Sequence, residues 1–72
     1  DPGRAQMSFS DYVNVVRTNQ AMRLLATTDM SITEVAYAVG FSSTSYFIQT
    51  FRKHKHISPN RFRKMCYEEF TA

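Results

Sequence analysis

The chain has 72 residues, a length that allows one small domain with a modest hydrophobic core. It carries a net charge of +3 and a single cysteine, Cys66, which excludes an internal disulfide framework and suits a reducing compartment. No apolar run is as long as a membrane span and no secretory leader is visible, so a soluble, cytoplasmic protein is expected.

Residues 1–7 show no periodicity and are expected to be a disordered lead-in or residues added in cloning. Residues 8–72 are expected to form the domain. Ser8 is predicted to cap a long helix, with Asp11 in its first turn, where negative charge is favoured. A short polar connection follows at 27–30.

The apolar residues of this long helix do not stay in one narrow stripe, which is typical of a helix that packs against two bodies. They are Phe9, Tyr12, Val13, Val16, Ala21, Leu24 and Leu25. Val16, Leu24 and Leu25 are expected to face the core of this chain. Val15 and Met22 fall on a separate flank, and they predict contacts with a neighbouring domain or with a second copy of the chain.

The segment 31–53 predicts two short helices separated by a tight bend. The first helix has one apolar stripe at helical spacing, formed by Ile32, Val35, Ala36 and Val39. Ser31 and Glu34 have the spacing of a capping box, and Gly40 follows the last apolar position, where a helix often ends at positive φ.

After the bend, Phe41 is expected in the core and Ser42 is expected to cap the second helix. One face of that helix carries Phe47, Thr50, Phe51 and His54. Ser45, Gln49 and Arg52 point the other way. A short helix, a small residue (Ala36) four before a turn glycine, and a helix with a polar outer face are typical of a helix-turn-helix. The spacing alone also fits an ordinary helical hairpin.

The charge distribution helps to decide between these two interpretations. No acidic residue occurs between Val35 and Tyr67, and six of the nine Lys and Arg lie between Arg52 and Lys64. A charge run is usually a solvated surface, but a run without carboxylates favours a polyanionic partner. In a DNA complex, the first residues of the second helix would meet base edges in the major groove; the candidates are Thr44, Ser45, Ile48 and Gln49.

A last helix is predicted over about 59–70, with Ser58 as its cap and Pro59 at its first position, where the missing N–H is not needed. Its inward residues are expected to be Phe62, Met65, Cys66 and Phe70. Its outward residues are expected to be Arg61, Arg63 and Lys64.

With these motifs the chain resembles the AraC/XylS family of bacterial transcription regulators. The matching elements are Tyr12 with Arg17, Ala21 and Leu24-Leu25; Ser31-Ile32-x-Glu34-Val35-Ala36; Gly40-Phe41; Ser45-Tyr46-Phe47; Phe51-Arg52-Lys53; and Ser58-Pro59-x-x-Phe62-Arg63. The family's DNA-binding region usually contains two helix-turn-helix units joined by a long helix. This chain is similar to the joining helix and the second unit, so the resemblance implies an upstream unit that would cover Val15 and Met22.

The resemblance implies an all-α domain in a homeodomain-like arrangement: a long connecting helix, a helix-turn-helix and a C-terminal helix. The residues expected to hold it together include Ala36, Gly40, Phe41, Phe47, Phe51, Pro59 and Phe62. It places Thr44, Ser45, Ile48 and Gln49 at bases. Together with the cation cluster, it predicts phosphate contacts for Tyr46, Arg52, Lys53, Lys55, Arg61, Arg63 and Lys64.

The partners implied are double-stranded DNA and, for the parent regulator, RNA polymerase. Arg17 matches a family arginine to which no role is assigned. The family commonly has glycine at the position of His56, which predicts positive φ with some strain at this histidine.

Other functions are weighed against this one. A helical protein-binding module whose basic surface docks on an acidic partner is the alternative. His54, His56 and Cys66 lack zinc-ligand spacing, and no nucleophile has a base and an acid at a recognisable spacing. We therefore expect no enzyme, no metal and no cofactor.

Overall fold

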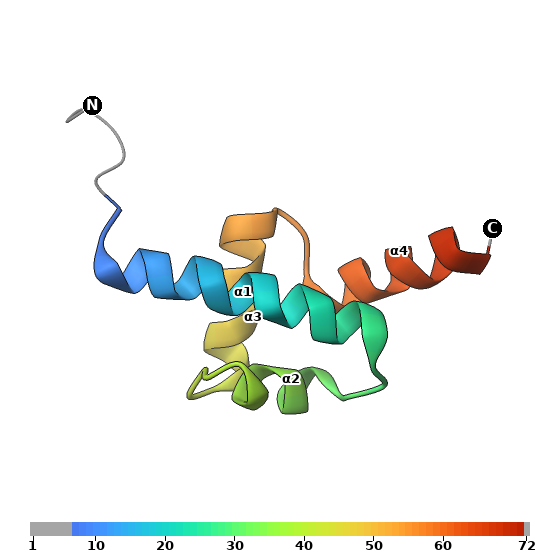
Figure 1. The fold of residues 1–72 in the computed structure, drawn as a ribbon, viewed down its shortest axis with the longest axis horizontal. Coiled ribbons are helices and arrows are strands. Elements are labelled where there is room, and N and C mark those ends of the chain that lie inside the picture. Colours follow the sequence, from blue (N-terminus) through green and yellow to red (C-terminus); the bar gives the residue numbers. More distant parts are fainter. Residues whose placement is uncertain (1–6, 72) are drawn as a thin grey trace.

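The computed structural model describes residues 7–71, and within them the chain is helical with no strand. The elements are α1 (Phe9–Thr27), α2 (Ile32–Ala38), α3 (Thr44–Lys55) and α4 (Pro59–Thr71), as Figure 1 shows. This confirms the expected all-α fold class. The lead-in expected over residues 1–7 lies outside the described part except for Met7, which is exposed.

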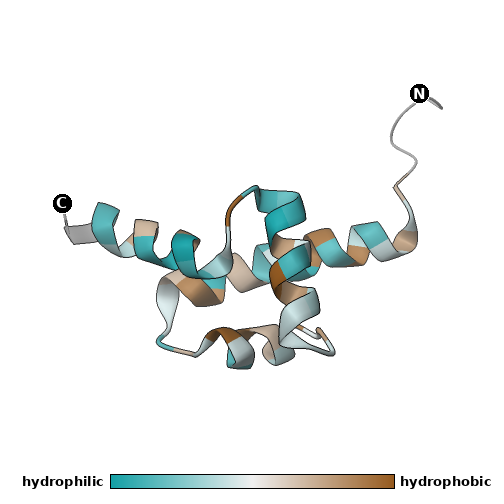
Figure 2. Ribbon diagram, turned by 180° about the vertical axis from the view of Figure 1, so that it is seen from behind, coloured by the Kyte–Doolittle hydropathy of each residue, from teal (hydrophilic) through white to brown (hydrophobic). Residues whose placement is uncertain are grey.

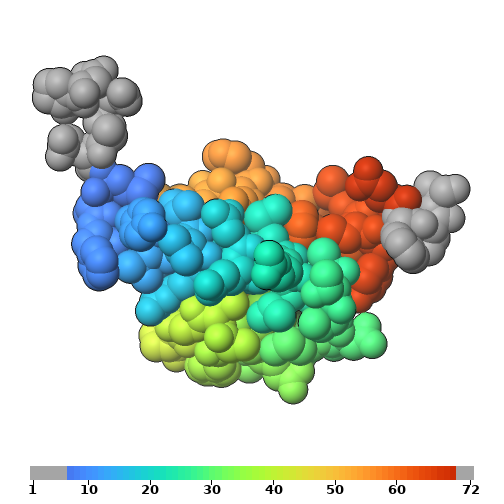
Figure 3. Space-filling view, in the orientation of Figure 1, coloured from blue at the N-terminus to red at the C-terminus, as the bar shows by residue number. Residues whose placement is uncertain are grey.

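The helix α1 is the support on which the other three helices pack. Figure 3 shows it lying across one face of the molecule, with α2 below it and α4 at its C-terminal end. The helix α3 crosses it on the other side, where Figure 2 shows the last turns of α3 as strongly hydrophilic. Therefore α3 presents one side to the core and the other to solvent.

Each of the four helices begins at a serine whose hydroxyl oxygen accepts a hydrogen bond from a backbone N–H three residues later. Ser8 accepts from Asp11 at 3.1 Å, and Ser31 accepts from Glu34 at 3.0 Å within a complete capping box. Ser58 accepts from the N–H of Arg61 at 3.1 Å, with Pro59 buried behind it. These caps confirm three of the predicted helix starts.

The predicted cap of the second motif helix is wrong by one residue. Ser43, not Ser42, has extended backbone angles (φ −151°, ψ 152°), and it accepts the N–H of Tyr46 at 3.1 Å. The N–H of Phe41 is already bonded to the carbonyl of Ala36, so the exposed Ser42 completes the bend before the helix can start.

The core is built around a run of phenylalanine rings that links the bend after α2 to α3 and α4. Phe47 lies 5.2 Å from Phe41 and 5.8 Å from Phe51, and Phe51 lies 6.0 Å from Phe62 on α4. Aromatic rings bury large apolar areas, which compensates for the small size of the domain. The other buried apolar residues come from α1, α2 and the bend: Ala21, Leu25, Val35, Ala36 and Val39.

One inward prediction on α4 and one prediction on the flank of α1 are corrected. The side of α4 that faces the rest of the chain carries the buried Pro59 and the half-buried Phe62, Arg63 and Cys66. Met65 is turned toward solvent and is 48% exposed. The side chain of Phe70 lies outside the described residues. Met22 packs against the core of this chain rather than being left for another body, while Val15 is half-buried.

Candidate nucleic-acid interface

The outer face of α3 is a polar surface directly behind the phenylalanine core. Phe47 and Phe51 are fully buried and Thr50 nearly so, whereas Ser45, Gln49 and Arg52 are exposed. The exposed three follow each other at spacings of four and three residues, so they form one stripe along the helix. The buried rings therefore fix which side of α3 faces outward.

The four residues predicted to face bases do not share the same environment. Ser45 and Gln49 are exposed at the centre of the stripe. Thr44 is half-buried, with its hydroxyl donating to the hydroxyl of Thr33 on α2 at 3.2 Å. Ile48 is half-buried and packs against the core. Ser45 and Gln49 are consequently the most accessible pair on this surface.

Four of the six basic residues in the cluster are free of the core and lie near the ends of α3 and α4. Arg52, Lys53, Arg61 and Lys64 are exposed. Lys55 is half-buried, and its ammonium group donates to the side-chain oxygen of Asn19 on α1 at 2.5 Å. The exposed cations make the end of α3 and the first half of α4 positive, and no acidic residue lies between them in sequence.

Arg63 has a different environment from the one predicted for it. Its guanidinium donates from Nε to the carbonyl of Leu25 at 3.0 Å, from Nη1 to Met30 at 2.6 Å and from Nη2 to Thr28 at 3.1 Å. All three nitrogens are thus occupied by backbone carbonyls at the end of α1 and in the connection. The outward position predicted for Arg63 is therefore wrong: its side chain is half-buried and bonded to the backbone of this chain.

The bend between α2 and α3 is closed by a side chain from α1. Gly40 has φ 106°, and a Cβ added there would lie 2.9 Å from Nε of Arg17. The guanidinium of Arg17 lies 5.9 Å from the ring centroid of Phe41, within the range of a cation–π contact. Arg17 therefore packs on the bend. This is a structural role, which the sequence alone did not assign.

Comparison with known proteins decides the family. A family model described as "Helix-turn-helix domain" matches residues 3–65, which is most of the chain. Relatives matched by sequence include AraC/XylS regulators. The chain belongs to the AraC/XylS family of helix-turn-helix regulators. The predicted family is confirmed, and the helices α2 and α3 are its helix-turn-helix.

Two relatives from Escherichia coli illustrate the likeness. The chain is 38% identical over 63 residues to the melibiose operon regulatory protein and 35% identical over 65 residues to YijO, an uncharacterized HTH-type transcriptional regulator. These matches cover 88% and 90% of this chain but only 21% and 23% of the relatives. The chain thus spans about a fifth of the length of these two family members.

A solved structure supports the same assignment. The C-terminal domain of the two-component response regulator yesN from Fusobacterium nucleatum superposes with a TM-score of 0.77 at 37% identity. The match covers 82% of this chain and 57% of the other. The chain is a helix-turn-helix domain of the kind found in transcription regulators.

Two hydrogen bonds between α1 and α3 were not predicted from the sequence. The side-chain amide of Asn14 donates to the hydroxyl of Tyr46 at 3.0 Å, and Asn19 accepts from Lys55 as described above. The partners in these pairs are 32 and 36 residues apart. A long separation of this kind leaves no local spacing signal, so only the packing of α1 on α3 reveals them.

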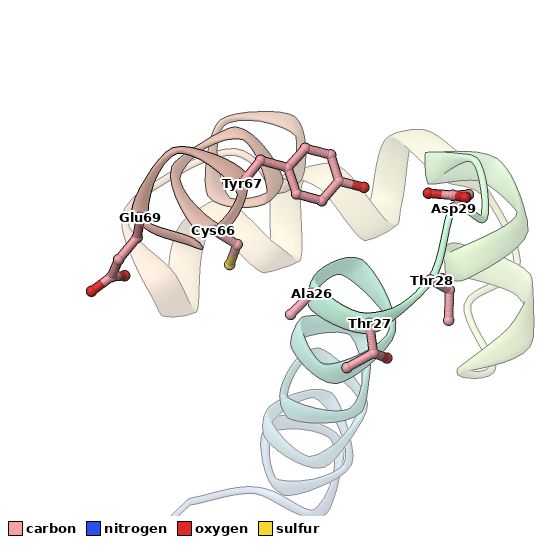
Figure 4. Close-up of a pocket in the computed structure, with 7 residues that line it drawn as sticks. All are labelled: Ala26, Thr27, Thr28, Asp29, Cys66, Tyr67 and Glu69. Atoms are coloured by element: carbon pink, nitrogen blue, oxygen red, sulfur yellow. The ribbon is translucent and has the colours of Figure 1, made fainter. Parts of the chain in front are cut away.

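A concave surface lies away from α3, between the end of α1 and the second half of α4. Its volume is about 720 Å³, and Figure 4 shows Ala26 on α1 and Cys66 on α4 among its walls. The remaining lining residues are Thr27, Thr28, Asp29, Tyr67 and Glu69. Within residues 7–71 there is no cluster of three metal-ligating side chains, and no helix is long and apolar enough to cross a membrane.

Proposed function

We propose that this chain binds double-stranded DNA sequence-specifically by placing the outer face of α3 in the major groove. The observation that carries the proposal is the polar stripe of Ser45, Gln49 and Arg52, which lies directly opposite the buried Phe47 and Phe51. The major groove is about 12 Å wide and admits an α-helix. The 12 residues of α3 make a rod about 18 Å long, enough to cross it.

The proposed contacts divide into two kinds. Gln49 can pair with adenine through N6 and N7, and Ser45 can donate to or accept from either base of a pair. The half-buried Ile48 presents its accessible atoms to a thymine methyl, and Thr44 contributes at the start of the helix. Few strong base pairings are available here, so we expect this domain alone to have a loose sequence preference.

Phosphate attraction is assigned to the exposed cations. Arg52, Lys53, Arg61 and Lys64 release counterions when they neutralise phosphates, which supplies affinity without sequence information. Lys55 is held by Asn19 and contributes less directly. Arg63 is left out, because three of its five N–H donors are bonded to carbonyls of this chain and hold the side chain half-buried.

Selection of preferred sequences from random duplex DNA tests the division of roles. Gln49→Ala is expected to change the preference at one base position by about 1–3 kcal/mol. Lys53→Ala is expected to weaken all sequences alike and to reduce the slope of log affinity against log salt by about 0.9. Gln20→Ala, the same substitution at an exposed position on α1, is the control for nonspecific effects. Equal, sequence-independent losses for Gln49→Ala and Lys53→Ala would contradict the proposal.

We further propose that the first turns of α1 pack against another part of the longer regulator or against a second copy. Met7, Phe9 and Tyr12 are 53%, 80% and 58% exposed, a concentration of apolar surface that a solvated helix rarely carries. Val15 is half-buried nearby on the same helix. Concentration-dependent sedimentation that Phe9→Ser abolishes is the expected result, and a strict monomer at high concentration would count against self-association.

Contact of the whole regulator with RNA polymerase is proposed on family membership alone.

A further inference from the structure

The hydrogen bond between Asn14 and Tyr46 sets the chemical role of the tyrosine hydroxyl. The amide nitrogen of Asn14 donates, so the hydroxyl oxygen accepts. A tyrosine hydroxyl has one hydrogen to donate, and within residues 7–71 the structure gives that hydrogen no acceptor. Tyr46 is 47% exposed, so its O–H is left to donate to a partner outside the chain.

The ring of Tyr46 is held as well as its hydroxyl. Its centroid lies 5.6 Å from that of Phe41 in an edge-to-face arrangement, and Phe41 in turn lies under the guanidinium of Arg17. Asn14 and Arg17 are one turn apart on α1. Two contacts from α1, one direct and one through Phe41, therefore fix the tyrosine before any ligand arrives.

The surroundings of the hydroxyl favour an anionic partner at the edge of the base-reading surface. A groove of about 230 Å³ lies between the first turns of α1 and the stretch of α3 from Tyr46 to His54. Asp11 and Asn14 line it on the α1 side, and Tyr46, Gln49 and Lys53 line it on the α3 side. The ammonium group of Lys53 and the O–H of Tyr46 are donors on the α3 wall, and Gln49 lies on the same wall. The carboxylate of Asp11 on the α1 wall would repel an anion bound there.

We propose that Asn14 is a positioning residue for one phosphate of the bound duplex. The amide of Asn14 donates to the Tyr46 hydroxyl oxygen and so leaves the tyrosine O–H to donate to a phosphate oxygen beside Lys53. Because hydrogen bonds in a chain polarise one another, the bond from Asn14 also makes the tyrosine O–H a stronger donor. Phosphate accepts and does not donate, so it matches a hydroxyl whose acceptor side is already used. The inference rests on the proposed function, because it requires the duplex backbone to pass the α1 side of α3.

A double-mutant cycle on duplex affinity tests the coupling. With a duplex obtained by selection, Tyr46→Phe is expected to weaken binding about tenfold or more, as for the loss of a hydrogen bond to a charged group. Asn14→Ala is expected to weaken binding about threefold in the parent chain and to have no further effect in the Tyr46→Phe background. Equal threefold losses in both backgrounds would overturn the proposal, since Asn14 would then act independently of the hydroxyl.

A scan of single methylphosphonate substitutions separates a positioning role from a merely structural one. Neutralising one linkage is expected to weaken binding by the parent chain. The same substitution is expected to weaken binding less in Tyr46→Phe and in Asn14→Ala, where only the attraction of Lys53 for that linkage is left to lose. Asn19→Ala is the matched control, because Asn19 also joins α1 to α3 but through Lys55. Its response at that linkage should equal that of the parent chain. Asp11→Asn should tighten binding, since it removes the opposing carboxylate.

The outcomes distinguish this inference from the proposed function. If the parent chain selects a sequence and Gln49→Ala changes it, but no linkage responds differently in Asn14→Ala, then the inference fails and the proposed function stands. If the parent chain binds no duplex, both fail. Thermal unfolding of each variant verifies that the domain is folded under the binding conditions.

Discussion

Replacing Arg63 with methionine is expected to destabilise the domain strongly, although the residue lies in a run of surface cations. The guanidinium joins α4 to the last turn of α1 and to the connection before α2 through the carbonyls of Leu25, Thr28 and Met30. The carbonyl of Leu25 falls in the last turn of α1, where backbone acceptors lack a partner within the helix. Methionine keeps much of the apolar stem and removes the three donors.

The expected loss in the free energy of unfolding is about 2–4 kcal/mol. A hydrogen bond to a charged group contributes roughly 1.5–3 kcal/mol, but three bonds from one half-buried side chain are not additive, and water can replace part of them. A domain of this size rarely has more than about 3–5 kcal/mol of stability. The variant is therefore expected to be close to its unfolding midpoint at 25 °C.

Urea unfolding followed by circular dichroism at 10 °C measures this loss. Arg61→Met is the matched control: Arg61 lies two residues earlier on α4 and is exposed, so its loss should stay within about 0.5 kcal/mol. Arg63→Lys should fall between the two, because a single ammonium cannot reproduce the planar fork of three donors. Equal stability of Arg63→Met and Arg61→Met would refute the assignment of Arg63 as a structural residue.

Three further predictions concern the bend, the end of α3 and the charged surface. His56→Gly should raise the free energy of unfolding by about 0.5–1 kcal/mol in urea titrations, because φ is 63° there; a decrease would mean that the histidine side chain stabilises the site. Gly40→Ala should lower the free energy of unfolding by about 1–2 kcal/mol. Adding Arg17→Ala to that variant should not restore the stability, because φ of 106° is unfavourable for alanine even when the space occupied by Arg17 is vacated. Duplex affinity of the parent chain should fall with salt at a log–log slope of roughly −3 to −4, one phosphate for each exposed cation. A salt-independent affinity in filter-binding titrations would exclude the proposed phosphate contacts.

Local rules predicted most of the fold. The caps at Ser8, Ser31 and Ser58 and the bend at Gly40 each depend on residues within a few positions, and the structure confirms them. His56 also adopts the positive φ that the family pattern suggested, and its N–H bonds to the carbonyl of Arg52. The error at Ser42 arose because two adjacent serines are equally good caps by composition alone.

The remaining features depend on contacts between distant parts of the chain. Arg63 lies 33–38 residues from the carbonyls it binds, and a basic residue in a basic run is ordinarily solvated. Its spacing of four from the buried Pro59 was the available signal that it faces inward. The same register explains why Met65 is exposed.

The outward face of α3 could be predicted, but the accessibility of each residue on it could not. Periodicity placed Ser45 and Gln49 opposite Phe47, as the structure confirms. The half-buried state of Thr44 depends on Thr33 of α2, and that of Ile48 depends on how the core closes beneath it. Both depend on how the helices pack together, which sequence spacing does not determine.

Mapping of backbone amide chemical shifts on addition of a selected duplex tests the central claim most directly. We expect the largest shift changes at Ser45 to Lys53 and in the first turn of α1 around Ser10. The shifts of the concave surface between α1 and α4, near Cys66 and Glu69, should stay unchanged. If α3 stays unperturbed while other surfaces respond, the outer face of α3 does not enter the major groove and the account is contradicted.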